Sequence, residues 1–543
     1  MLAAALLAYV VLGSPATATA DTVSAELRSL IAQAHHPWAR QPDFARYVDV
    51  VARLYASRAD ATLWLTDQGL GPSGKSALAA VMAASDEGLV PADYDAATLA
   101  GLARGIPHRS WNAVAIARFD LLLTIGLTRY LDDLHGGRIR PGPFGFGRAP
   151  AALDLAAAVS GAARGDSVAA LVRALEPPLA QYQNLRRHLA EYRRLADNGP
   201  FVPLSAHLPI RPGAGYTGAA ALRRRLAALG DLAMDDVGAE RGVYDAQLVG
   251  GVRRFQARHS LEADGLLGPA TLAALNVPYA VRVAQIELAM ERLRALPTLG
   301  RQRFLVVNIP AFELFALDSV GGSGAPSLRM KVVTGRALDT RTPLFFSDLR
   351  YVEFRPYWTV PRSILVKEIL PILRRHPAYL RAHAMEMVGP RQIVVGDVVT
   401  PERLRQLAAG QLNVRQRPGE QNALGRAKFV FPNAANVYMH GTPQTELFSR
   451  SRRDFSHGCI RLEDPEALAA WVLQDQTAWS RQAIEAAMTG QSTTRALLSR
   501  PMPVVVYYTT AVAEPDGSIR FLPDVYGHDR TLSEALKAGR APV

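Results

Sequence analysis

The sequence contains a single cysteine, Cys459, so no disulfide can form within the chain. After residue 20 it has no run of about 18 uninterrupted apolar residues, which argues against an ordinary membrane-spanning helix in that part. Internal repeats and low-complexity tracts are lacking as well. The chain has 543 residues, of which 49% are hydrophobic and 20% charged, a composition typical of a globular protein. We therefore expect roughly two to four folded domains.

The first twenty residues differ from the rest of the chain. The segment Met1–Leu12 is almost wholly apolar, and Ala18-Thr19-Ala20 supplies the small-x-small pattern that signal peptidase accepts. Residues 1–20 therefore predict an export signal and a periplasmic protein. Because no basic region precedes the apolar run, an uncleaved signal that tethers the protein to the inner membrane is the alternative.

The net charge is +12 at pH 7, which favours an anionic partner such as a cell-wall polymer, a nucleic acid or a membrane surface. Arg supplies most of this charge, and a genome-wide bias towards Arg explains it equally well. No groove-reading motif accompanies the charge, and export also argues against nucleic acid, so we expect no nucleic-acid partner. The oligomeric state is not predicted.

Helical spacing of apolar residues dominates from residue 21 to 199, which predicts a helical scaffold domain. A Pro-rich connector, residues 200–212, leads to a small three-helix module at residues 213–278. This module resembles the peptidoglycan-binding domain 1 family through Phe255-Gln256 and the segment from Leu261 to Thr271. Ser260 stands where that family usually has Gly. We expect Phe255 to belong to the core rather than to a binding surface.

A β-rich domain is predicted at residues 300–510, beginning with a hairpin at residues 304–317. A charged insertion at residues 363–425 reads as helical, and its place before the reactive motif suggests a lid over a substrate groove. Residues 511–543 form a hairpin, with a turn at Asp516-Gly517, and a tail. The overall fold class is multidomain α+β.

The most informative segment runs from His440-Gly441 to the sequence Ser456-His457-Gly458-Cys459-Ile460-Arg461. A thiol with an ordinary pKa is mostly protonated at neutral pH, so a nucleophilic cysteine needs a base. We expect His440 to end a strand and Cys459 to stand at the start of a helix, whose dipole would lower the thiol pKa. Two alternatives remain at this point: Cys459 as a small buried apolar residue, and a zinc site made by His440, His457 and Cys459.

This segment resembles the active-site signature of the YkuD-type L,D-transpeptidases. The resemblance implies that Cys459 attacks a tetrapeptide stem between diaminopimelate and D-alanine and that His440 accepts the thiol proton. It also implies that the Gly441 carbonyl orients His440 and that amides around Gly458 and Cys459 stabilise the oxyanion. The chain order, with signal, scaffold, binding module and catalytic domain, fits the large periplasmic members of the family.

Further site residues are candidates with weaker support. His457 has a supporting role, and Ser456 belongs to the motif. Arg461 is expected to hold a substrate carboxylate or to brace the loop. Tyr438 and Trp358 resemble the aromatic residues that line the donor groove of the family, although either residue fits a core position equally well.

The sequence thus predicts a cysteine L,D-transpeptidase that forms 3-3 cross-links in peptidoglycan, with stem peptides as donor and acceptor, and with no cofactor or metal. The alternatives are an L,D-carboxypeptidase, a zinc-dependent wall peptidase and a non-catalytic cell-wall binding protein. The zinc alternative lacks a His-Glu-x-x-His helix, and the intact His440 and Cys459 argue against a decayed enzyme.

Overall fold

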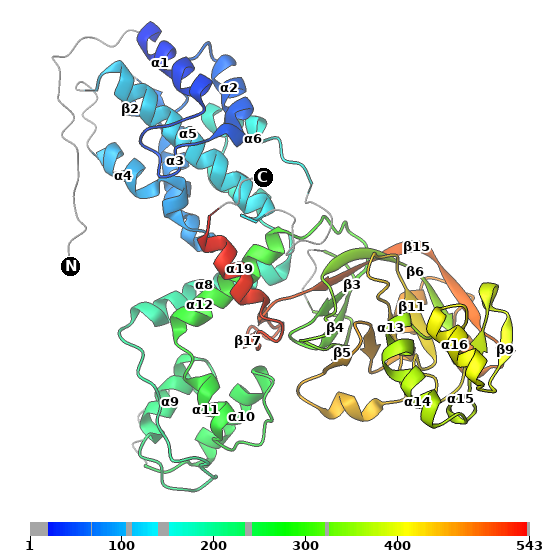
Figure 1. Cartoon of the computed structure of the whole chain (residues 1–543). Coiled ribbons are helices and arrows are strands. Elements are labelled where there is room, and N and C mark those ends of the chain that lie inside the picture. Colours follow the sequence, from blue (N-terminus) through cyan, green and yellow to red (C-terminus); the bar gives the residue numbers. More distant parts are fainter. Residues whose placement is uncertain are drawn as a thin grey trace. The chain divides into compact units, whose positions relative to one another are not determined.

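A computed structural model describes residues 20–66, 68–104, 111–139, 151–233, 242–320 and 325–539 (Figure 1). The predicted export signal, residues 1–20, lies outside the described residues apart from Ala20. The chain divides into two compact units, Met1–Arg140 with Pro150–Pro177, and Pro141–Ala149 with Pro178–Val543. None of the helices in the described ranges has both the length and the hydropathy that a membrane span requires.

The first unit is helical around one central helix, α5 (Ala113–Gly136), which is buried along most of its length. The Asn112 side chain caps this helix by accepting a hydrogen bond from the Ala115 amide at 2.9 Å. One short hairpin, β1 (Leu65–Thr66) and β2 (Gly69–Leu70), interrupts the helical pattern that the sequence predicted. The other helical elements are α1 (Ala20–Gln33), η1 (Ala45–Tyr47), α2 (Val48–Ala56), α3 (Pro72–Met82), η2 (Ala83–Glu87), η3 (Pro91–Tyr94), α4 (Ala96–Arg104), α6 (Leu155–Arg164) and α7 (Val168–Leu175).

The second unit begins with α8 (Ala180–Asp197), which packs along α12 (Tyr279–Arg294) in one hydrophobic cluster. Between them lies the three-helix module of α9 (Ala219–Ala228), α10 (Ala246–Arg258) and α11 (Pro269–Leu275). The Gln256 amide nitrogen of this module donates to Asp264 at 2.9 Å and to Thr271 at 3.1 Å. Gly265, at a φ of +76°, makes the turn beside them and donates to the Gln256 oxygen. The residues that carry the family signature therefore hold the module together.

The β-rich part of the second unit is a nine-stranded sheet with the order β13-β5-β14-β12-β11-β6-β15-β3-β4. A further pairing between β4 and β5 closes eight of these strands into a barrel. The hairpin expected at residues 304–317 is confirmed as β3 and β4, paired in antiparallel register. The strands are β3 (Phe304–Asn308), β4 (Glu313–Leu317), β5 (Leu328–Gly335), β6 (Phe345–Phe354), β11 (Ala427–Val430), β12 (Met439–His440), β13 (Asp454–Ser456), β14 (Ile460–Leu462) and β15 (Thr494–Tyr507).

The two faces of this sheet have different partners. One face, which includes Val352, Met439 and Ile460, packs in a core with α17 (Pro465–Leu473) and α18 (Arg481–Thr489). On the opposite face, β3, β4 and β15 are covered by α8 and α12. An apolar cavity of about 120 Å³ lies beneath these two helices, and none of its lining residues belongs to the Cys459 motif. The same face over β14, β12, β11 and β6 carries the site described below.

The insertion is mixed in structure, and the prediction that it is purely helical was wrong. Its helical elements are α13 (Arg362–Ile364), η6 (Leu365–Ile369), α14 (Leu370–Arg375), α15 (Tyr379–Ala382), η7 (Pro390–Gln392) and α16 (Pro401–Ala409). They pack on a four-stranded sheet made of β7 (Trp358–Thr359), β10 (Asn413–Gln416), β8 (Met385–Val388) and β9 (Val394–Gly396). Because the insertion has its own hydrophobic core, it is a small subdomain.

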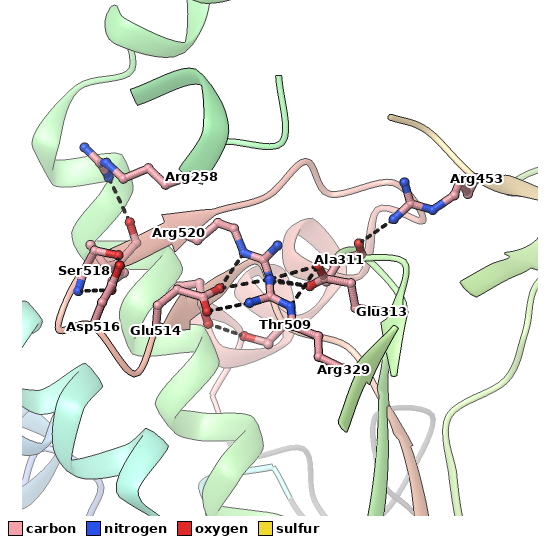
Figure 2. A network of polar contacts seen from close by, with 12 residues as sticks. Arg258, Ala311, Glu313, Arg329, Arg453, Thr509, Glu514, Asp516, Ser518 and Arg520 are labelled. Atoms are coloured by element: carbon pink, nitrogen blue, oxygen red, sulfur yellow. Dashed lines mark hydrogen bonds and ion pairs between the residues drawn. The ribbon is translucent and has the colours of Figure 1, made fainter. Parts of the chain in front are cut away.

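The chain ends with a hairpin, β16 (Ala511–Ala513) and β17 (Ile519–Phe521), followed by α19 (His528–Lys537). The turn expected at Asp516-Gly517 lies between the two strands, with Gly517 at a φ of +85°. The Arg258 guanidinium of α10 donates to the Ile519 carbonyl at 2.8 Å, so the hairpin joins the three-helix module to the barrel side of the unit (Figure 2).

Candidate active site

The pairing of β12 with β14 brings the two halves of the motif together. The strands are parallel, with Met439 opposite Ile460 and His440 opposite Arg461. Side chains alternate between the faces of a strand, so the neighbours of the buried Met439 and Ile460 share the opposite face. Tyr438, His440, Cys459 and Arg461 therefore lie on one face, with Cys459 and His440 at diagonal positions on adjacent strands.

A set of short hydrogen bonds fixes the turn that carries Cys459. The Gly458 amide donates to the Ser456 hydroxyl at 3.2 Å, and this hydroxyl donates to the Cys459 carbonyl at 2.5 Å. The Thr342 hydroxyl donates to the Gly458 carbonyl at 2.8 Å. Gly458 has a φ of +112°, a conformation that a residue with a Cβ rarely adopts. The Gly458 amide, which the resemblance assigns to the oxyanion site, is thus already bound to Ser456.

The prediction that Cys459 stands at the start of a helix was wrong. Cys459 directly precedes β14, and α17 begins at Pro465, where the Asp464 side chain caps it. The N-terminus of α17 is therefore not at Cys459. Burial raises the pKa of the Cys459 thiol, and hydrogen bonds from Tyr438 with the charges of Lys428 and Arg461 offset part of that rise.

His440 is buried, with 5% of its surface exposed. Its Nδ1 lies 2.5 Å from the Gly441 carbonyl, and because a carbonyl can only accept, Nδ1 carries the proton. Burial, followed by the charge of Arg461, lowers the pKa of His440 to about 3. The imidazole is therefore neutral at physiological pH, and its Nε2 is a free base.

Tyr438 is the residue that lies opposite Cys459 in the register of β12 and β14. The backbone and the hydroxyl of Tyr438 both act to lower the pKa of the Cys459 thiol. Burial raises the pKa of the Tyr438 phenol far above neutrality, so this hydroxyl keeps its proton and remains a donor. The Tyr438 ring also packs 5.6 Å from the His440 ring, measured between centroids.

Three comparisons with known proteins bear on this arrangement. Residues 302–506 match the family model of the L,D-transpeptidase catalytic domain. Residues 217–275 match a family described as "Putative peptidoglycan binding domain", and residues 49–189 match a scaffold domain family. The chain carries an L,D-transpeptidase catalytic domain. The resemblances that the sequence showed are therefore confirmed at the level of these families, and so is the α+β fold class.

A curated relative from Haemophilus influenzae, named "Putative L,D-transpeptidase", is 32% identical over 254 residues. This match covers 46% of the present chain and 49% of the relative, so the chain spans about half the length of that protein. The crystal structure of an L,D-transpeptidase from Xylanimonas cellulosilytica shares 15% identity, covering 56% of this chain and all of that one. Its TM-score of 0.17 is too low to support a structural conclusion.

Two predicted site residues of the catalytic domain connect to the insertion. His457 lies 2.7 Å from the Glu368 carboxylate of η6, measured from Nε2 to Oε1, and both side chains are partly exposed. Trp358 pairs with Gln416 across β7 and β10 and packs on the core of the insertion. Arg461 donates to the Gln444 side chain at the rim of the site.

In this structure His440, His457 and Cys459 do not form the zinc site that the alternative hypothesis requires. Within the described ranges, no group of three His, Cys, Asp or Glu side chains is arranged to hold a metal ion. His457 is engaged with Glu368, whereas His440 hydrogen-bonds the Gly441 carbonyl on the buried side.

Lys428 is a residue of the site that the sequence reasoning missed. It lies on β11, opposite both His440 on β12 and Glu353 on β6. The available signal was its position in the short strand Ala427–Val430, where Lys428 is the charged residue in an otherwise apolar run. The alternation of that strand places Phe429 in the core and Lys428 on the face of Cys459.

A polar network around Glu313 and Arg453 lies beside the segment that precedes β13 (Figure 2). The Arg453 guanidinium donates to the carbonyls of Val332, at 3.2 Å, and Phe312, at 3.0 Å. Nearby, Glu313 binds the guanidinium groups of Arg329 and Arg520. Since Arg453 precedes β13, this network anchors the strand that ends at Ser456.

Proposed function

We propose that the chain is a cysteine L,D-transpeptidase that joins peptidoglycan stem peptides by 3-3 cross-links. The observation that carries this proposal is the shared face of Cys459, Tyr438 and His440 within a matched L,D-transpeptidase catalytic domain. The matched peptidoglycan-binding family supports peptidoglycan as the substrate. Such a substrate also supports an extracytoplasmic, periplasmic location, in line with the predicted export signal.

In the first half of the reaction, the Cys459 sulfur attacks the carbonyl between diaminopimelate and D-alanine of the donor stem. The Nε2 of His440 accepts the thiol proton, while Gly441 holds Nδ1–H in place. The hydroxyl of Tyr438, the register neighbour of Cys459, donates to the negative charge that develops. The carbon–nitrogen bond then breaks, D-alanine leaves with the proton from His440, and a thioester remains on Cys459.

In the second half, the side-chain amine of an acceptor stem attacks the thioester. Neutral His440 accepts the proton of the amine, the new amide forms, and the Cys459 sulfur leaves and is protonated again. Water in place of the amine would release a tripeptide, which is carboxypeptidase activity. The two outcomes differ only in which acceptor reaches the acyl-enzyme.

Because both the thiol and the imidazole are neutral at rest, the nucleophile forms only as the reaction proceeds. The raised pKa of Cys459 and the pKa of about 3 of His440 disfavour a standing thiolate–imidazolium pair. Proton transfer is therefore coupled to attack on the carbonyl, where the growing charge moves from sulfur to the oxyanion.

Mass spectrometry of full-length chain incubated with disaccharide-tetrapeptides tests the proposal. A dimer that lacks one D-alanine is expected, together with an acyl-enzyme that lacks D-alanine on the protein. Cys459→Ala and His440→Gln should abolish both products, whereas His207→Gln, an exposed histidine of the connector, is the matched control. The same products are expected in the presence of a chelator. A monomer that lacks D-alanine would show that the chain is a carboxypeptidase and not a cross-linking enzyme. Unchanged substrate would refute the proposal that the chain is an enzyme acting on these stems.

A further inference from the structure

Lys428 lies on the same face of the sheet as His440 and Cys459. The register of β11 places it between His440 on β12 and Glu353 on β6. Burial lowers the pKa of the Lys428 ammonium, and the charges of Glu353 and Cys459 act in the opposite direction. Its register neighbour Glu353 is hydrogen-bonded to the Arg495 guanidinium at 2.6 Å.

The Lys428 ammonium rests on the Tyr438 ring, 4.1 Å from the ring centroid. At this distance a cation is attracted to the negative face of an aromatic ring and withdraws electron density from it. Withdrawal of density from a phenol ring makes its O–H a stronger hydrogen-bond donor. Tyr438 lies opposite Cys459 in the register of β12 and β14, so the ring that Lys428 contacts belongs to the neighbour of the thiol.

The charges around the sulfur are mostly positive. Lys428 and Arg461 both favour the anionic form of Cys459 and the neutral form of His440. The other charged groups associated with this face are Glu353 on β6, Arg495 on β15, Arg336 after β5, Glu446 on η8 (Thr445–Ser449), and the pair of His457 with Glu368 of η6. Arg461 donates to the Gln444 side chain, whereas Lys428 contacts the ring of Tyr438.

We propose that Lys428 is a positioning residue that acts through Tyr438 to stabilise negative charge on Cys459. The cation holds the ring against β11 and strengthens the phenol as a donor, and the phenol donates to the sulfur as its proton leaves. This inference rests on the proposed function and deepens it. The sequence led us to expect a helix dipole that stabilises the Cys459 thiolate, and the inference assigns that stabilisation to Lys428 and Tyr438. It makes no demand on the identity of the substrate.

Alkylation of the full-length chain with iodoacetamide tests this role without any substrate. Cys459 is the single cysteine of the sequence, so the rate reports this thiol alone. Rates measured from pH 6 to 10 give the thiol pKa for the wild type and for Lys428→Met, Lys428→Arg and Tyr438→Phe. Lys331→Met is the matched control, because Lys331 is a partly exposed lysine of the same barrel, paired with Glu463 at 3.6 Å.

Removal of the charge in Lys428→Met should raise the thiol pKa by about one unit and slow alkylation at pH 7.5 about tenfold. Lys428→Arg should restore a profile close to that of the wild type, and Lys331→Met should leave it unchanged. If Lys428 acts through the phenol, the double variant with Tyr438→Phe should be no slower than the slower single variant. Circular dichroism checks that each variant is folded.

Coincident pH profiles for Lys428→Met and the wild type would overturn the proposal. A normal profile combined with a raised KM for tetrapeptide would also overturn it, because Lys428 would then bind a substrate carboxylate. If Lys428→Met does not fold, the pH profiles of Lys428→Arg and Tyr438→Phe are compared instead. The thiol pKa should rise in Tyr438→Phe, which lacks the phenol, and should stay near the wild-type value in Lys428→Arg, which keeps the charge. Failure of cross-linking in the wild type would refute the proposed function while leaving the alkylation profile as evidence on Lys428.

Discussion

The protonation state of His440 predicts how the rate of the donor reaction depends on pH. Burial and the nearby Arg461 lower its pKa to about 3. At pH 5 such a histidine is about 1% protonated, whereas one with an ordinary pKa of about 6.5 would be about 97% protonated. If neutral His440 is the base, the donor reaction should therefore change by less than about twofold between pH 7 and pH 5.

The assay is a single-turnover measurement of D-alanine release, with full-length chain in excess over tetrapeptide. An ordinary histidine would lose about 25-fold of the rate over the same interval, since its neutral fraction falls from about 76% to about 3%. Circular dichroism at both pH values controls for unfolding. A fall close to 25-fold would refute the reasoning that burial and cationic neighbours keep this imidazole neutral.

Substitution of Arg461 tests what lowers the pKa of His440. After burial, the charge of Arg461 is the largest contribution that lowers the pKa of His440. Arg461→Gln should raise that pKa by roughly one unit, so the acid limb of the rate profile should move upward by the same amount. An unchanged acid limb in this variant would mean that burial alone sets the protonation state.

Three further outcomes are expected. Glu313→Gln should lower the free energy of unfolding by about 2–3 kcal/mol in urea titrations, because it removes a charge partner from the buried Arg520. Although burial works to raise the pKa of Glu313, its Arg partners hold it below the ordinary value, so this stabilisation should persist above pH 4.5 and disappear as the pH falls further. Ser456→Ala should slow acylation about tenfold with little change in Tm, because the hydroxyl bridges the turn around the thiol. His457→Gln should change the acylation rate by less than about threefold, since its pair with Glu368 is partly exposed to solvent.

The sequence predicted the main parts of the fold because their signals are local. Alternating apolar residues identified the hairpin of β3 and β4, and the signature around Gln256 identified the three-helix module. The insertion was misread because its strands β8, β9 and β10 are short and lie between helical stretches. Their pairing depends on contacts across the insertion, which periodicity within one window does not show.

The sequence supplied a list of candidate site residues but not their arrangement. The motif pointed to His440 and Cys459, whereas the parallel pairing of β12 with β14 that joins them is a non-local event. The start of α17 was nevertheless readable, because Asp464 followed by Pro465 is a typical cap and first-turn pair. Lys428 escaped notice because its role depends on two registers, one to β12 and one to β6.

The neutral resting pair has a consequence for a lone thiol in the proposed periplasmic location. Oxidants react with thiolates far faster than with thiols, so a standing thiolate–imidazolium pair would expose Cys459 to oxidation between turnovers. Burial keeps the sulfur protonated, and the same cations that disfavour protonated His440 favour the thiolate once a carbonyl is in place to receive the charge. In the mechanism that we propose, reactivity with substrate is thus separated from reactivity with solvent-borne oxidants, and Tyr438 with its neighbouring cations takes the place of a helix dipole.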